Sequence, residues 1–389
     1  MHSNLQAAYW FIGVLVAVIA VGLAALYTLK LRDIRRRQAA EAYQAKHGDW
    51  FTYVLANLDG EEPLYPPPGS LKPAELRVIQ DKLIVWIEQL RGAQQAKLIA
   101  LCERMGLVER QLKRLESPFE WVKLDAAYYL GCMRSHQAVP GMMKLLASMR
   151  FSPMVFIVGR AIAKCARHTE ELRDMVHLLL SHKKESQPLV ADILAESDLD
   201  YSAMLETFLR GGDADRVRLA LAAMQKHSLA GSGDLLFKLT ASDNADIRLE
   251  ASKLLLRDAA VVTEERARKL LAHPDADVRA QAAQALGRLG LKPCVKLLRT
   301  SLADAEWQVR YNSAKSLAKL GEEGFTALCE AAEEETGAVA ETARTVIQEE
   351  MKSHESPSLG RSVEWVAVRD MQRFVYGNFF GQKELLSDR

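Results

Sequence analysis

The stretch from Lys269 to Gly321 repeats its pattern of apolar and polar positions at a fixed interval. Shifted by thirty-one residues it lies on itself, so that Val278–Arg279 falls on Val309–Arg310 and Gly290 falls on Gly321. Each unit holds an apolar helix, a short turn with acidic residues, and a second helix that opens with Val-Arg. Neither helix can bury its apolar stripe alone, and we therefore expect the units to stack as a repeat architecture.

Looser copies of the second helix precede and follow this stretch. They begin at Trp121, Met154, Pro188, Arg216, Asp246 and Ala338. The copies near Met154 and Pro188 depart from the pattern, because they lack the Val-Arg pair. The pattern predicts roughly eight helical hairpins spaced about thirty residues apart. We predict an all-α fold, an α-solenoid of stacked helical hairpins over residues 116–352, with a helical cap at 73–115 that closes one end.

Polar residues mark the turns between the paired helices. Asn244 and Asp275 stand three residues before the Ile-Arg and Val-Arg starts. This is the N-cap position, where a side-chain oxygen accepts a hydrogen bond from an orphan backbone N–H. Arg248, Arg279 and Arg310 recur in the well-matched repeats, and we expect them to bridge neighbouring units through the turn aspartates.

An uncharged apolar run occupies residues 7–29. About twenty apolar residues cross a bilayer as a helix. Tyr9 and Trp10 lie at one end of the run and Tyr27 at the other, as in the aromatic belts of membrane proteins. We predict a transmembrane anchor over residues 1–30.

The charges that flank this run predict its orientation. The short head before it has no Lys or Arg, whereas the segment Lys30–Arg37 is strongly basic. The positive-inside rule then predicts a single-pass protein of the inner (cytoplasmic) membrane, with the N-terminus outside and the C-terminal domain in the cytoplasm. A cleaved signal peptide is the alternative, but the head lacks a basic n-region and the charges lie on the wrong side.

Two further segments lie outside the array. Residues 31–72 form a juxtamembrane segment and a Pro-rich linker, because the three consecutive prolines in Glu61–Ser70 favour extended geometry. Residues 353–389 form an aromatic-rich tail, which either folds back onto the array or docks to a partner. Its aromatic residues are Trp365, Phe374, Tyr376, Phe379 and Phe380.

The composition limits the class of protein. The chain is 49% hydrophobic and 7% aromatic, which suits an Ala/Leu-rich helical fold. Its formal net charge is +1, so the protein as a whole has no strong attraction for nucleic acid. Five cysteines are scattered without a Cys-x-x-Cys pair, and we expect buried free thiols in a reducing compartment. They are Cys102, Cys132, Cys165, Cys294 and Cys329.

Common enzyme signatures are absent from the sequence. It has no Gly-x-x-x-x-Gly-Lys-Ser/Thr loop, no His-Glu-x-x-His and no Gly-x-Ser-x-Gly. His177 and His182 are five residues apart, which is poor spacing for one helix face. We therefore predict no catalytic residues, no cofactor and no metal site.

Basic residues recur at equivalent positions in the second helices of three adjacent repeats. The positions of Gln284 and Arg288 in one repeat carry basic residues in the repeats on either side. We predict that this basic stripe holds an acidic segment of a protein partner. The alternative is an ordinary charged helix face, neutralised by Glu250 and Asp277. The basic stripe consists of Lys253, Arg257, Arg288, Tyr311, Lys315 and Lys319.

The repeat resembles the HEAT-repeat family, within the superfamily that includes PBS-lyase-like repeats. That family shows an apolar helix, Asp-Pro-Asp-x-x-Val-Arg, and then Ala-Ala-x-Ala-Leu-Gly. The matching residues are Pro274, Asp275, Val278, Arg279, Ala282, Ala283, Ala285, Leu286 and Gly287. The resemblance implies that the second helices line the concave face of the solenoid, and that this face binds proteins.

The order of elements resembles bacterial membrane-anchored HEAT-repeat proteins, including the helical lead-in at Leu90–Leu107 and Gln111–Leu115. This resemblance implies a membrane-tethered scaffold or adaptor with a membrane-associated protein partner. It further implies an accessory role in an envelope or exopolysaccharide system that contains a glycosyltransferase. Ala-rich repeats of this type also resemble bilin lyases and nucleic-acid-binding HEAT-like glycosylases. The apolar span and the neutral charge argue against both, and we expect neither a small-molecule substrate nor nucleic acid.

Overall fold

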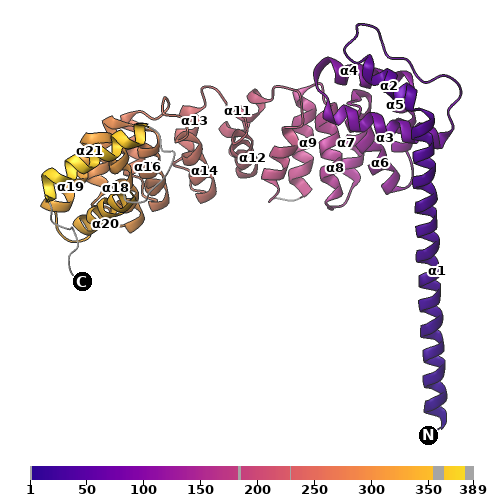
Figure 1. The fold of residues 1–389 in the computed structure, drawn as a ribbon, viewed down its shortest axis with the longest axis horizontal. Helices are drawn as coiled ribbons and strands as arrows, with labels where there is room; N and C mark the ends of the chain where they lie inside the picture. The colour runs from indigo at the N-terminus through magenta and orange to yellow at the C-terminus, as the bar shows by residue number, and fades with distance from the viewer. Residues whose placement is uncertain (1, 183–184, 228, 354–362, 382–389) are drawn as a thin grey trace. The chain divides into compact units, whose positions relative to one another are not determined.

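The computed structural model describes residues 2–182, 185–227, 229–353 and 363–381. Within these residues the chain forms 21 α-helices and two short 3₁₀ helices, and no strand (Figure 1). It divides into two compact units. Unit 1 comprises Met1–His182 with Glu196–Leu199, and unit 2 comprises Lys183–Ala195 with Asp200–Arg389. The predicted all-α class is confirmed.

Unit 1 begins with one long helix, followed by shorter helices. They are α1 (His2–Lys46), α2 (Gly48–Ala56), α3 (Pro73–Gln89), α4 (Gly92–Arg104), α5 (Leu107–Leu115), α6 (Glu120–Cys132), η1 (His136–Ala138), α7 (Val139–Ser148), α8 (Met154–Cys165) and α9 (Thr169–His182). From Gly13 to Leu29 the side chains of α1 are exposed. In the described part of the chain, α1 is the one helix long and apolar enough to cross a membrane. A signal sequence near an N-terminus meets the same criteria.

Helix α1 continues without interruption through the basic segment and ends against α3. Lys46 Nζ donates a hydrogen bond to Glu75 Oε1 at 3.0 Å, and the carboxylate of Glu75 is buried. The hydrogen bond from Lys46 lowers the pKa of Glu75, and the backbone N–H of Lys72 lowers it further. The end of α1 is therefore fastened to the rest of unit 1 by a buried charge.

The Pro-rich segment between α2 and α3 has no helix, as predicted, but it is packed against its neighbours. Leu64 is buried, and Arg104 Nη1 donates to its carbonyl oxygen at 2.9 Å. The indole N–H of Trp50 donates to the carbonyl oxygen of Tyr65 at 3.0 Å. These bonds satisfy backbone carbonyl oxygens that have no partner within a helix or a sheet.

Unit 2 consists of first and second helices in alternation. The helices are α10 (Gln187–Leu194), α11 (Ser202–Arg210), α12 (Ala214–Met224), α13 (Gly233–Leu239), α14 (Ala245–Leu255), α15 (Glu264–Leu271), α16 (Ala276–Arg288), η2 (Lys292–Cys294), α17 (Val295–Ser301), α18 (Trp307–Lys319), α19 (Gly321–Glu334), α20 (Ala338–Ser353) and α21 (Val363–Phe380). The second helices, α10 to α20 at the even numbers, pack each against the next. The second helices therefore form one continuous layer of unit 2.

Caps and arginines fix each hairpin of unit 2. Asn244 caps α14 and Asp275 caps α16, as predicted. Arg248 Nε donates to Asp275 Oδ2 at 2.8 Å, and Arg279 Nε donates to Asp304 Oδ2 at 2.7 Å. These two arginines therefore bridge neighbouring hairpins of unit 2, which confirms the prediction for them.

Arg310 departs from that prediction. Its Nη1 donates to the carbonyl oxygens of Asp304 and Ala305, in the turn before its own helix. The turn that follows α19, Glu335–Gly337, holds no aspartate. Arg310 therefore has no turn aspartate in the next hairpin to bridge to, and the carboxylate of Glu335 pairs with Arg299 instead.

The last helix, α21, packs against α19. Gln372 Nε2 donates to the carbonyl oxygen of Ala318 at 2.8 Å, and Val375 is buried. Phe374 is 65% exposed, and Tyr376, Phe379 and Phe380 are half-buried. The side chain of Trp365 lies outside the described residues. Part of the aromatic tail thus covers α19, while the side chain of Phe374 is exposed.

Candidate partner-binding groove

Three successive second helices of unit 2 carry the basic stripe: α14, α16 and α18. Four members of the stripe surround one groove of about 340 Å³, which we call the basic groove. It is lined by Lys253, Leu256, Arg257, Gln281, Gln284, Ala285, Arg288 and Lys319. No aspartate or glutamate stands among these eight residues. The arrangement therefore suits a negatively charged ligand.

Helical spacing brings these side chains to one face. Gln284 and Arg288 are four residues apart on α16, whereas Lys253 lies on α14 and Arg257 in the turn directly after the C-cap of α14. Residues at this spacing lie on the same face of a helix. The N-caps of α14 and α16 start both helices at equivalent points of the repeat. Equal register then sets the two pairs beside each other.

The two arginines are held at the groove by backbone carbonyls. Arg257 Nη1 donates to the oxygen of Gln225 at 3.2 Å, and Arg288 Nη2 donates to the oxygen of Leu256 at 2.8 Å. Gln225 and Leu256 are the C-caps of α12 and α14. A cation at the negative end of a helix dipole is stabilised. Because a guanidinium has five N–H donors, each arginine keeps further donors for a ligand.

The other polar groups of the basic groove are less engaged. Lys253 Nζ pairs with Glu250 Oε1 at 2.7 Å on the exposed side of α14. Lys319 has neither a hydrogen bond nor an ion pair within the part of the chain that the structure describes. Gln281 Oε1 is buried and has no partner among the described residues.

Gln281 was missed by the sequence-based prediction, although a signal was present. It precedes Gln284 by three residues, which places both on one helix face. A search for positive charge alone overlooks such neutral acceptors.

Two predicted members of the stripe are not part of the groove. Lys315 Nζ lies 2.9 Å from Glu349 Oε2 and 3.1 Å from Glu350 Oε1, both on α20. The hydroxyl of Tyr311 donates to Glu349 Oε2 at 2.8 Å. Burial lowers the pKa of Lys315, but the two carboxylates outweigh it and the net shift is upward. The free basic stripe is therefore shorter than predicted, because α20 already neutralises its end.

Groups that enzymes use are not assembled elsewhere in the described residues. No three of their His, Cys, Asp or Glu side chains are placed to hold a metal ion. His177 is exposed, and His182 Nε2 lies 3.1 Å from the carbonyl oxygen of Leu146. All five cysteines are buried and free, as predicted. Burial raises the pKa of Cys102 and Cys165 to about 12, which keeps these thiols protonated and unreactive at neutral pH.

A family model described as HEAT repeats matches residues 264–348. This range contains α15 to α19 and most of α20, and therefore two of the three helices of the basic groove. The fold is an α-solenoid of stacked helical hairpins with HEAT repeats, and its N-terminal helix is apolar enough to span a membrane. Solenoids of this class offer an extended surface suited to protein binding. No curated protein matches the sequence.

Three solved structures illustrate the similarity. A chain of the Pds5–Scc1 complex is 14% identical with a TM-score of 0.34, over 87% of this chain and 62% of that one. Human deoxyhypusine hydroxylase in complex with glycerol is 16% identical with a TM-score of 0.26, over 84% and 99%. The CpcE–CpcF complex of phycocyanin lyase from Nostoc sp. PCC7120 is 16% identical with a TM-score of 0.23, over 69% and 94%. This chain thus spans less than two thirds of the chain from the Pds5–Scc1 complex. Sequence identities and TM-scores as low as these carry no argument about function.

Proposed function

We propose that this protein is a membrane-tethered adaptor, and not an enzyme, which binds an acidic segment of a protein partner in the basic groove. The observation that carries the proposal is the groove itself. Lys253, Arg288 and Lys319 converge from three helices and Arg257 from the turn after α14, and no carboxylate lines the space between them. Such a concentration of one sign of charge steers and selects an oppositely charged partner.

The protein itself contains an example of the proposed chemistry. Glu349 and Glu350, adjacent on α20, bind Lys315 and Tyr311 at the end of the same basic stripe. Arg288 and Lys319 stand at equivalent positions one turn further along their helices. A partner helix or strand with paired carboxylates would meet the basic groove in the same way.

A membrane anchor would determine where the basic groove meets its partner. We propose that α1 is a membrane anchor, that the part of the chain after residue 30 lies in the cytoplasm, and that the partner is also membrane-associated. Confinement to one surface raises the effective concentration of two components without any added contact. The resemblance to bacterial membrane-anchored HEAT-repeat proteins favours a partner from an envelope or exopolysaccharide system, such as a glycosyltransferase.

Site-specific cross-linking in membranes tests this function. A photoreactive residue at Gln284, which is exposed and lines the groove, should capture one membrane protein. The double substitution Arg288→Glu with Lys319→Glu should abolish the cross-link, because it reverses the charge of the groove.

A photoreactive residue at Arg268 is the matched control, since this exposed side chain on α15 lies outside the groove and pairs with Glu265 on its own helix. Capture of the same protein from both positions, or from the charge-reversed variant, would contradict the proposal. Purification from detergent with only soluble proteins attached would contradict the membrane-associated partner.

A further inference from the structure

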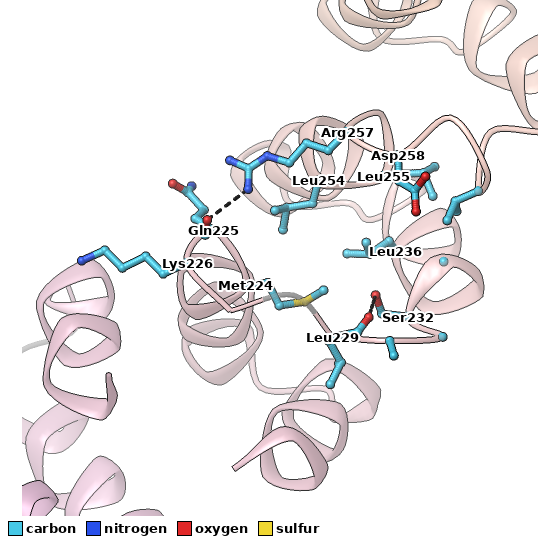
Figure 2. Close-up of a pocket in the computed structure, with 14 residues that line it drawn as sticks. Met224, Gln225, Lys226, Leu229, Ser232, Leu236, Leu254, Leu255, Arg257 and Asp258 are labelled. Atoms are coloured by element: carbon cyan, nitrogen blue, oxygen red, sulfur yellow. Dashed lines mark hydrogen bonds between the residues drawn. The ribbon is translucent and has the colours of Figure 1, made fainter. Parts of the chain in front are cut away.

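A second hollow adjoins the basic groove. It has a volume of about 320 Å³ and lies between the end of α12, the start of α13 and the end of α14 (Figure 2). Its lining residues are Met224, Gln225, Lys226, Leu229, Ala230, Gly231, Ser232, Gly233, Leu236, Leu254, Leu255, Arg257, Asp258 and Val261. We call it the apolar hollow. Its volume is near the lower end of the roughly 300–1,000 Å³ of small-ligand pockets.

The floor of the hollow is hydrophobic. Met224, Leu236 and Leu254 point toward its interior in Figure 2 and are each less than a tenth exposed. Binding is favourable when an aliphatic side chain displaces water from such a surface. An aliphatic side chain therefore fits against these three residues, while Lys226, Arg257 and Asp258 make the rest of the lining polar.

The hollow exists because the repeat is irregular at this point. Helix α12 ends at Met224 and α13 begins at Gly233, and α13 has only seven residues. A Cβ on Gly233 would lie 2.5 Å from Val261 Cγ1, so this position cannot carry a side chain without displacing Val261. A short first helix with a glycine at its start leaves the ends of α12 and α14 uncovered.

Arg257 is common to the hollow and the basic groove. Figure 2 shows its side chain reaching from the turn after α14 to Gln225, with the hydrogen bond drawn as a dashed line. The guanidinium thus forms the border between an apolar space on one side and a cationic space on the other. One bound segment can reach both.

We infer that the partner segment has two parts: carboxylates for the basic groove and a bulky aliphatic residue, such as leucine, for the apolar hollow. The inference rests on the proposed function and names the motif that the same surface would recognise. The groove occupies the space beside α14 and α16, and the hollow the space between α12 and α14.

The distance between the two spaces sets the spacing of the motif. They are one helix apart, and packed helices lie about 8–10 Å from each other. An extended chain rises about 3.3 Å per residue. The aliphatic residue therefore follows, or precedes, the acidic pair by about three positions.

Synthetic peptides test the motif on the full-length protein in detergent micelles. Each peptide carries a Glu-Glu pair. The first has leucine three residues after the pair, the second has alanine there, and the third has leucine directly after the pair. Fluorescence anisotropy should show that the first binds about tenfold more tightly than the second, from the burial of the leucine side chain. The third should bind like the second.

Protein variants separate the hollow from the groove. Ala230→Trp fills the hollow from its exposed rim and should remove the difference between the leucine and alanine peptides. Ala303→Trp, at an exposed turn outside both spaces, should keep that difference. Circular dichroism checks that each variant is folded. If Ala230→Trp does not fold, the comparison of the three peptides on the unsubstituted protein still tests the motif.

The outcomes distinguish this inference from the proposed function. If the leucine and alanine peptides bind equally but Arg288→Glu weakens both, the hollow is not a subsite and the basic groove stands. If no peptide shows salt-dependent binding and Arg288→Glu changes nothing, both ideas fail.

Discussion

At the scale of single residues, a side chain's partner decides whether a charge is structural or available. Arg279 and Lys319 are both basic residues of second helices, but Arg279 is bound to Asp304 while Lys319 faces the groove. The repeat pattern of the sequence distinguishes these two sets, because the Val-Arg arginines recur next to turn aspartates. It did not predict that Lys315 is neutralised, since Glu349 and Glu350 lie more than thirty residues away in a helix with a looser pattern.

The pair of Arg279 and Asp304 predicts a dependence of stability on pH. Burial raises the pKa of Asp304, but the hydrogen bond from Arg279 outweighs this and the pKa is lowered overall. A carboxyl whose pKa is lower in the folded state stabilises the fold above its unfolded pKa of about 4, and this contribution is lost as the pH falls through the lowered value. The substitution Asp304→Asn should therefore lower the free energy of unfolding by about 1–3 kcal/mol at neutral pH. In the acid range, the free energy of unfolding of this variant should depend less on pH than that of the unsubstituted protein.

Urea denaturation followed by circular dichroism between neutral and acid pH measures this effect. Asp243→Asn is the matched control, because this aspartate occupies an equivalent turn but is exposed. Equal stability of Asp304→Asn and Asp243→Asn at neutral pH would show that the bridge does not stabilise the stack.

At the scale of helices, the second helices were predictable because each carries its own start signal. The predicted starts at Met154 and Ala338 coincide with the first residues of α8 and α20, and those at Trp121, Pro188, Arg216 and Asp246 fall one or two residues inside their helices. The first helices gave weaker signals, and the shortness of α13 was not predicted. Residues Gly231–Gly233, at the start of α13, interrupt the apolar pattern, but their consequence, the apolar hollow, depends on how α12 and α14 end.

Close approach of neighbouring second helices predicts the effect of a glycine substitution. A Cβ on Gly287 of α16 would lie 2.5 Å from Ser316 Cα on α18 and 2.4 Å from its Oγ. Ser316 Oγ also donates to the carbonyl oxygen of Ala283 at 2.7 Å, so it cannot move freely. Gly287→Ala should destabilise unit 2 by about 1–3 kcal/mol, the usual effect of overpacking.

Gly377→Ala in α21 is the control for this experiment. No atom lies within 4 Å of the added Cβ, so the substitution should be neutral or stabilise by up to about 1 kcal/mol through helix propensity. Thermal melting of the two variants measures the difference. Equal melting temperatures would mean that α16 and α18 adjust to the extra methyl group without loss.

At the scale of the whole chain, the sequence predicts separate tasks for its two ends. The apolar run was recognised from composition alone, because crossing a bilayer requires only length and the absence of charge. The basic groove needed the structure, since its four cations come from residues 253–319 and only the register of three helices brings them together. What the composition of the N-terminal run leaves open is whether it stays attached, because a signal sequence passes the same test.

The charges around α1 predict that it is retained, and this prediction can be measured directly. If α1 is an anchor, the full-length protein should stay in the membrane pellet after extraction with alkaline carbonate and should be released by detergent. Mass spectrometry of the membrane form should recover peptides from residues 1–30. A variant that lacks residues 1–30 should move to the soluble fraction while keeping its helical circular dichroism signal, since the side chains from Gly13 to Leu29 are exposed and support no core. A mature protein that begins after residue 30 would identify the run as a signal sequence. The groove would then act without a tether, and its affinity alone would have to hold the partner.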